Sequence, residues 1–133
     1  MMLAIKRLLG DKKIVLLGSI VYTLLITTAF LLPTSGLPKV HFIIPIDKLI
    51  HVGIHGVLSF AWLLVFHAFY PQNDSKRMMM IVLLCISYGI IIEMFQELLV
   101  ASRQADGFDI IANTIGTLFG MILFRNIKGR IKT

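Results

Sequence analysis

The sequence predicts an all-α protein, an integral membrane bundle of four transmembrane helices with both termini in the cytoplasm. Its 133 residues are 57% apolar and only 15% charged, with a mean hydropathy of +0.87. An average soluble domain is roughly 45–50% apolar and about 25% charged, and a short chain cannot bury such a surplus in its own core. The apolar residues fall into four blocks, and the basic residues gather on alternate connectors. A soluble monomer, a disordered chain and a disulfide scaffold are excluded, the last because Cys85 is the single cysteine.

The first apolar block covers residues 14–32, which is 19 positions without a charge. Spanning a bilayer takes about 20 apolar residues, so this block predicts a transmembrane helix. It follows a basic stretch, and a signal peptide is therefore the alternative. Because it exceeds the usual apolar core of roughly 7–15 residues and no small-residue cleavage pattern follows, we expect it to be retained. Pro33, Pro38 and Pro45 then prevent the helix from continuing.

Three further blocks follow at residues 49–70, 78–100 and 108–124. The connector at 71–74 is rich in turn-forming residues, and the connector at 101–107 is short and polar. Neither an internal repeat nor a second composition regime interrupts the pattern. We therefore expect one membrane domain over residues 1–133.

The net charge of +6 could indicate a nucleic-acid partner, but its placement indicates a membrane orientation instead. If the helices alternate, most of the basic residues lie on one side, and the positive-inside rule places that side in the cytoplasm. Only Lys39, Lys48 and Arg103 lie on the other side. The residues on the cytoplasmic side are Lys6, Arg7, Lys12, Lys13, Lys76, Arg77, Arg125, Lys128, Arg130 and Lys132.

Polar residues recur on one helical face in each of the last three blocks, about 5–10 Å below the outer end at 1.5 Å per residue. Glu93 is the most informative, because a carboxylate near the bilayer centre costs about 2.5–3.5 kcal/mol. Since none of these faces can meet lipid, we expect them to face one another. The alternative is that they only hold the helices together, although such bonds average about 0.6 kcal/mol and need no Glu. The faces comprise His51, His55 and Ser59, then Gly89, Glu93, Gln96 and Val100, then Asp109, Asn113, Gly116 and Gly120, with Glu97 on a neighbouring stripe.

The outer ends of the second and fourth helices are both N-termini, which favour anions. Lys48 and Arg103 lie beside these ends, so the sequence predicts an anion site above Glu93 and His51. Three alternatives stay open. Arg103 can form a salt bridge with Asp106 or Asp109, Lys48 can be an interfacial anchor, and Asp106 can be an N-cap with Asp109 in capping-box spacing.

Two other site chemistries are less favoured by the pattern. His51 and His55 share a helix face and Glu93 could complete a zinc-like set, but the glutamate of a zincin motif is missing between the histidines. A nucleophilic triad would have only Ser59 or Ser102 available, without a Gly-x-Ser-x-Gly turn. We therefore expect neither a metal nor a cofactor.

The order of these polar residues resembles the VanZ-like family of small bacterial membrane proteins. The resemblance runs from Asp47 to Gly120 and departs from the usual pattern at His55, where an aromatic or aliphatic residue is common. The family takes its name from a member that raises resistance to the glycopeptide teicoplanin. Similarity to a broader set of four-helix membrane domains implies action on lipid head groups or lipid-linked cell-wall precursors. The motif reads Asp47, Lys48 and His51, then Glu93 and Gln96, then Arg103, Asp106, Asp109, Asn113, Gly116 and Gly120.

These patterns together predict a protein of the bacterial cytoplasmic membrane that binds, and modifies, a phosphate-bearing lipid head group at the outer leaflet. Glu93 is the expected general base or acid, His51 its proton partner, and Asp109 an orienting catalytic residue. The rival is a non-catalytic bundle that shields a lipid, moves a solute, or assembles through Gly116 and Gly120 within the chain or with a second copy. The expected substrate-binding residues are Arg103, Lys48, Asp47, Gln96, Asn113 and Asp106.

Overall fold

The computed structural model describes residues 11–33, 46–72, 75–100 and 106–130. These residues form four helices, which are α2 (Lys12–Leu31), α3 (Ile46–Phe69), α4 (Ser75–Leu99) and α5 (Gly107–Ile127), and a short 3-10 turn, η1 (Lys128–Arg130). Each of the four helices is long and apolar enough to cross a membrane. The described part of the chain contains no strand. The predicted all-α fold of four membrane-spanning helices is confirmed.

Each helix begins one to three residues before the predicted position, because polar residues form its first turn. Asp11 caps α2, and its side chain accepts hydrogen bonds from the backbone N–H groups of Lys13 and Ile14. Asp106 caps α5 by accepting from the N–H of Phe108, as its alternative role in the sequence suggested. Hydropathy alone places the start of a span at its first apolar residue, so it misses a first helical turn that is polar.

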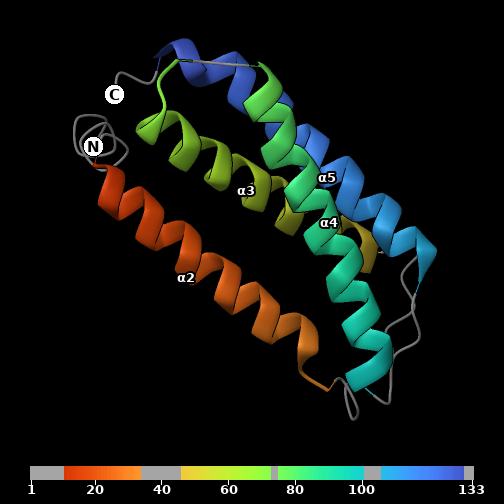
Figure 1. Ribbon diagram of the computed structural model, residues 1–133. Helices are drawn as coiled ribbons and strands as arrows, with labels where there is room; N and C mark the ends of the chain where they lie inside the picture. Colours follow the sequence, from red (N-terminus) through yellow and green to blue (C-terminus); the bar gives the residue numbers. More distant parts are fainter. Residues whose placement is uncertain (1–10, 34–45, 73–74, 101–105, 131–133) are drawn as a thin grey trace.

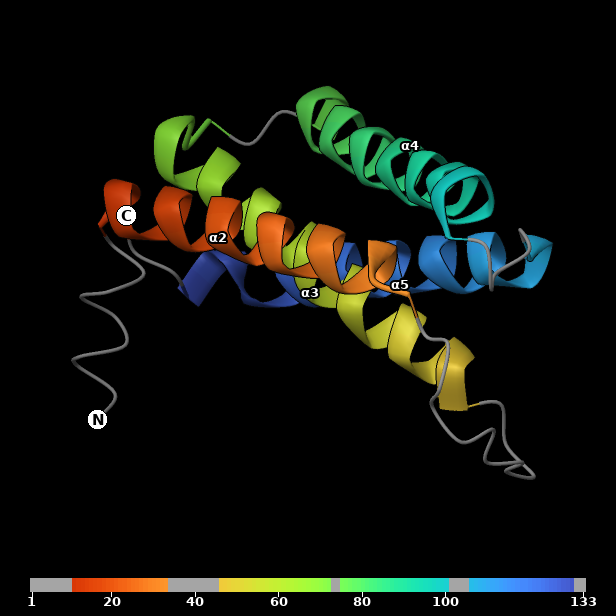
Figure 2. The same cartoon turned by 90° about the horizontal axis from the view of Figure 1, so that it is seen from below.

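The helices alternate in direction, so α2 and α4 end where α3 and α5 begin (Figure 1). This end of the bundle is called the site end below. At the opposite end, the Lys12 ammonium lies 5.9 Å from the Phe69 ring and the Arg77 guanidinium 5.5 Å from the Tyr70 ring. In Figure 1, α2 and α5 lie at opposite edges with α3 and α4 between them. The view from below in Figure 2 shows α4 along the upper side of the bundle, with α2, α3 and α5 overlapping beneath it.

The closest helix pair is α3 with α5, and glycine makes this approach possible. A Cβ atom on Gly116 would overlap the carbonyl group of Val52, and one on Gly120 would overlap the carbonyl of Gly56 and the hydroxyl of Ser59. The Ser59 hydroxyl donates across the interface to the Thr117 carbonyl at 2.9 Å. Both glycines of the small-residue motif are therefore used in a contact within the chain.

The helix α2 is attached through polar side chains in its middle and through apolar packing around them. The Tyr22 hydroxyl donates to the Ile54 carbonyl of α3 at 2.9 Å, and the Trp62 indole N–H donates to the Thr23 hydroxyl at 3.1 Å. Thr27 and Tyr88 share a hydroxyl–hydroxyl bond of 2.8 Å between α2 and α4. Around these bonds packs an apolar cluster of Ile26, Phe30, Leu58, Cys85 and Ile92.

Large apolar side chains cover the outer faces of all four helices. Leu24, Leu83 and Phe119 are exposed by 62%, 56% and 61% of their surface. A contiguous apolar exterior of this kind is unfavourable in water and is what hydrocarbon requires of a membrane span.

Candidate functional site

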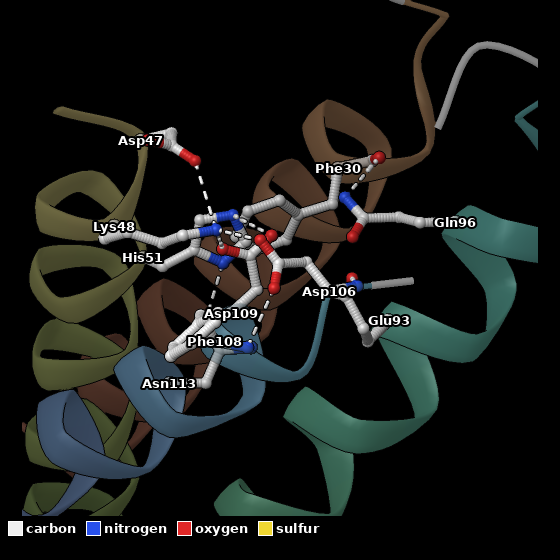
Figure 3. A network of polar contacts seen from close by, with 10 residues as sticks. All are labelled: Phe30, Asp47, Lys48, His51, Glu93, Gln96, Asp106, Phe108, Asp109 and Asn113. Atoms are coloured by element: carbon white, nitrogen blue, oxygen red, sulfur yellow. Dashed lines mark hydrogen bonds and ion pairs between the residues drawn. The ribbon is translucent and has the colours of Figure 1, made fainter. Parts of the chain in front are cut away.

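The predicted polar residues converge at the site end of the bundle (Figure 3). They come from the first turns of α3 and α5 and from the last turns of α4, with one aromatic ring from the end of α2. Because the helices alternate, residues far apart in the sequence reach the same level of the bundle. The expectation that the polar faces of the last three helices face one another is therefore met by these contacts.

Lys48 is the hub of the ionic part of the site. Its ammonium donates to the carboxylates of Asp106 and Asp109 and lies 3.2 Å from the Asp47 carboxylate. The Lys48 side chain is 24% exposed, so it is not simply an anchor reaching for water. The hydrogen bond from Lys48 holds the pKa of the Asp106 carboxyl below its usual range, and the Phe108 N–H adds to this effect.

His51 connects α3 to α5 in the buried part of the site. Its Nδ1 lies 2.9 Å from the Asn113 Oδ1, and its Nε2 lies 3.8 Å from the Asp109 carboxylate. Since the Asn113 oxygen can only accept, this arrangement makes Nδ1 the donor. A neutral ring then directs the lone pair of Nε2 toward Asp109, whereas a protonated ring directs an N–H there. His51 therefore has protein groups at both nitrogens.

Glu93 joins the end of α4 to the start of α5. Its Oε1 accepts the backbone N–H of Asp106 at 2.8 Å, which fixes the orientation of the carboxylate. The other oxygen, Oε2, is buried and has no hydrogen-bond partner among the described residues. A buried carboxylate oxygen without a partner is costly, and it is the atom most available to a ligand.

Gln96 lies one turn beyond Glu93 and holds the end of α2. Its amide nitrogen donates to the Phe30 carbonyl at 2.9 Å, while its Oε1 is buried without a described partner. The Phe30 ring stacks on His51 with 5.0 Å between the ring centres. Phe30 is the site residue that the sequence reasoning missed. Its signal was an aromatic residue near the end of the first apolar block, three residues before Pro33.

The remaining predicted residues take several positions. Asp47 lies on the rim, where 65% of its side chain is exposed, and Glu97 points outward and is exposed. His55 lies one turn deeper than His51, is fully buried, and has no described partner at either ring nitrogen. Arg103, the predicted phosphate-binding residue, lies outside the described residues. Among the residues that are described, no group of three His, Cys, Asp or Glu side chains could hold a metal ion.

Three buried polar atoms without described partners therefore lie near the ionic hub. They are Glu93 Oε2, Gln96 Oε1 and the Asn113 amide nitrogen. The two oxygens can accept hydrogen bonds and the nitrogen can donate one, so together they match a ligand that carries both donors and acceptors. The arrangement can also move a proton at Glu93 Oε2, the carboxylate oxygen that no described group occupies.

The fold and the site define a multi-pass membrane protein with an acid-rich polar site at one end of four helices. The model of the VanZ/LLP1 family matches residues 13–128, and the chain therefore belongs to the VanZ/LLP1 family. The match confirms the predicted resemblance and extends it to the first helix. A search of the curated proteins and a search of the solved structures each found no match.

Proposed function

We propose that this protein binds the phosphate-bearing head group of an envelope lipid or lipid-linked cell-wall precursor at the outer leaflet of the bacterial cytoplasmic membrane, and chemically modifies it. The orientation rests on the basic residues, which gather at the end of the bundle opposite the site. A head group in the outer leaflet then lies at the depth of Lys48 and Glu93.

The observation that carries this proposal is the set of unpartnered polar atoms beside the ionic hub. Each unsatisfied buried group costs about 1–3 kcal/mol, and a helical membrane protein gains nothing by retaining three of them without a ligand. The hydroxyl groups of a lipid head group can donate to Glu93 Oε2 and Gln96 Oε1. A phosphate or ester oxygen can accept from the Asn113 amide.

The roles proposed for the described residues follow from their contacts, and the role of Arg103 rests on its place in the sequence motif. Lys48 and Arg103 are the proposed phosphate-binding residues. Because Lys48 is shared among Asp47, Asp106 and Asp109, the phosphate replaces a carboxylate at its ammonium. Glu93 takes or gives a proton at its free oxygen, and the N–H of Asp106 keeps this carboxylate in place. His51 and Asn113 position the α5 side of the site, because each holds the other across the α3–α5 interface.

The rival is a bundle that binds a lipid without turnover. It is favoured by the enclosure of His51, whose two nitrogens face Asn113 and Asp109, so that no atom of this predicted proton partner is open to a substrate. If the protein catalyses a reaction, Glu93→Gln stops product formation but not lipid binding; if it only binds lipid, wild-type protein forms no product either. One experiment therefore separates the two functions.

The experiment uses purified protein in nanodiscs with phosphatidylglycerol, phosphatidylethanolamine or undecaprenyl phosphate, and follows both retained lipid and products by mass spectrometry. We expect Glu93→Gln to abolish product while retaining lipid. Glu97→Gln is the matched control, since Glu97 is exposed one turn away on the same helix. Absence of any product with wild-type protein would refute catalysis, and absence of retained lipid would refute the whole proposal. Expression in a teicoplanin-sensitive host tests the link to glycopeptide susceptibility.

A further inference from the structure

The core of the site is sealed in this structure. Glu93, Gln96 and His51 are exposed by 2%, 1% and 4% of their surface, and the Phe30 ring covers His51. A lipid that approaches from within the bilayer can therefore reach the free oxygen of Glu93 from the side only if two helices separate. The question is which pair of helices separates most easily.

The contact between α2 and α4 beside this core is short. The α3–α5 pair is locked by backbone contact at Gly116 and Gly120, whereas α2 touches α4 over a short stretch only. Two hydrogen bonds span the α2–α4 contact, from Gln96 to the Phe30 carbonyl and between Thr27 and Tyr88. Contacts with few buried partners open at the lowest free-energy cost.

A lateral groove continues along the same contact below the site. It has a volume of about 270 Å³, and its walls include Thr23 from α2, Trp62 from α3, and Cys85 and Tyr88 from α4. The Tyr88 ring lies 5.9 Å from the His55 ring, which is one turn below His51. Cys85 lies about 12 Å along the helix axis from Glu93 at 1.5 Å per residue. The groove is thus in line with the site and within reach of a lipid tail.

We propose that a phospholipid enters the site sideways between α2 and α4, with one acyl chain lying in the groove lined by Thr23, Trp62, Cys85 and Tyr88. This inference rests on the proposed function, because it requires the head group to bind at Glu93. An acyl chain is the fitting occupant since the groove is almost entirely apolar and opens within the spans, where hydrocarbon is the solvent. Phe30 and Gln96 form the closure between the groove and the head-group site.

The test closes the groove reversibly. Thr23→Cys places a thiol opposite the native Cys85, and a short, membrane-permeant bis-methanethiosulfonate then tethers α2 to α4. Three probes are compared by native mass spectrometry and calorimetry, namely dioleoyl phosphatidylglycerol, its deacylated head group glycerophosphoglycerol, and undecaprenyl phosphate. The reagent applied to wild-type protein, and to Thr23→Cys with Cys85→Ser, controls for modification of a single thiol. Reduction of the tether controls for misfolding.

We expect the tether to weaken phosphatidylglycerol binding by about tenfold or more, equivalent to at least about 1.4 kcal/mol, and reduction to restore it. Glycerophosphoglycerol binding should change less than twofold, because it needs no groove and can enter past the partly exposed Lys48 and Asp106 side chains. Unchanged phosphatidylglycerol binding after tethering would overturn the lateral route while leaving the head-group site intact. Loss of undecaprenyl phosphate binding alone would assign the groove to an isoprenoid chain and overturn the acyl assignment. If untethered protein binds none of the probes, the proposed function itself fails.

Discussion

Replacing Gly116 by alanine tests how the site is held together. The added Cβ would overlap the Val52 carbonyl, and restoring ordinary contact requires α3 and α5 to separate by on the order of 1 Å. The obstructing atoms are backbone and cannot rotate away, so we expect a loss of about 1–3 kcal/mol, as for overpacked cores. Gly18→Ala is the matched control, since nothing lies within 4 Å of its added Cβ. In Gly18→Ala, the higher helix propensity of alanine should raise the free energy of unfolding by about 0.5–1 kcal/mol.

The assay is unfolding in a titration with sodium dodecyl sulfate, followed by the fluorescence of the single tryptophan, Trp62. Trp62 reports on the bundle because its indole N–H binds Thr23 of α2. The two alanine variants should differ by about 1.5–4 kcal/mol in opposite directions from wild type. Gly116→Ala should also weaken lipid binding, since the His51–Asn113 bond spans the widened interface. Equal stability of the two variants would show that α3 and α5 do not approach as described.

Three further predictions concern the polar site and its orientation. Asn113→Leu should lower the free energy of unfolding by about 1–3 kcal/mol in the same titration, because it leaves a His51 nitrogen buried without a partner; a neutral result would contradict the bond. Lys48→Met should lower the free energy of unfolding above about pH 4, and this loss should shrink on acidification. The reason is that the lowered pKa of Asp106 adds stability, which disappears only as the pH falls through that lowered pKa. A loss that stays constant down to pH 2 would refute this coupling. Arg103→Cys in a background without the native cysteine should react with an impermeant maleimide from outside the cell, and labelling only from the cytoplasm would reverse the orientation.

The four spans could be predicted from hydropathy because the bilayer sets both the length and the apolar character of each helix. Their exact limits could not, since capping depends on polar residues that hydropathy counts as loop, as at Asp11 and Asp106. The helix α2 was predicted as a span, but its contacts were not predicted. Its prediction rested on 19 positions without a charge, whereas Thr23 and Thr27 occur at four-residue spacing and bind Trp62 and Tyr88. This periodic pair of threonines was a signal for a packed face.

The site was predictable to the level of which residues meet, but not of which atoms pair. Helical spacing and equal depth brought His51, Glu93 and Asn113 to one place, because no polar face can turn to lipid. The pairing depends on helix rotation and on backbone groups, which have no sequence signature. Hence Glu93 binds the N–H of Asp106 and Gln96 binds the carbonyl of Phe30, contacts that no side-chain pattern indicates.

The small-residue motif of Gly116 and Gly120 allows the contacts of the polar motif, because both lie at the α3–α5 interface. Helices usually pack with their axes about 8–10 Å apart, a distance at which the side chains between them are large. At the α3–α5 interface the missing Cβ atoms of Gly116 and Gly120 let the backbones touch, so His51 reaches Asn113 directly and Ser59 reaches the Thr117 carbonyl. By contrast, α2 is joined to α3 and α4 by side-chain hydrogen bonds and by apolar packing. A closely packed α3–α5 pair positions the polar groups, and α2 covers them through side-chain contacts. This is the arrangement that the proposed lateral entry of a lipid needs.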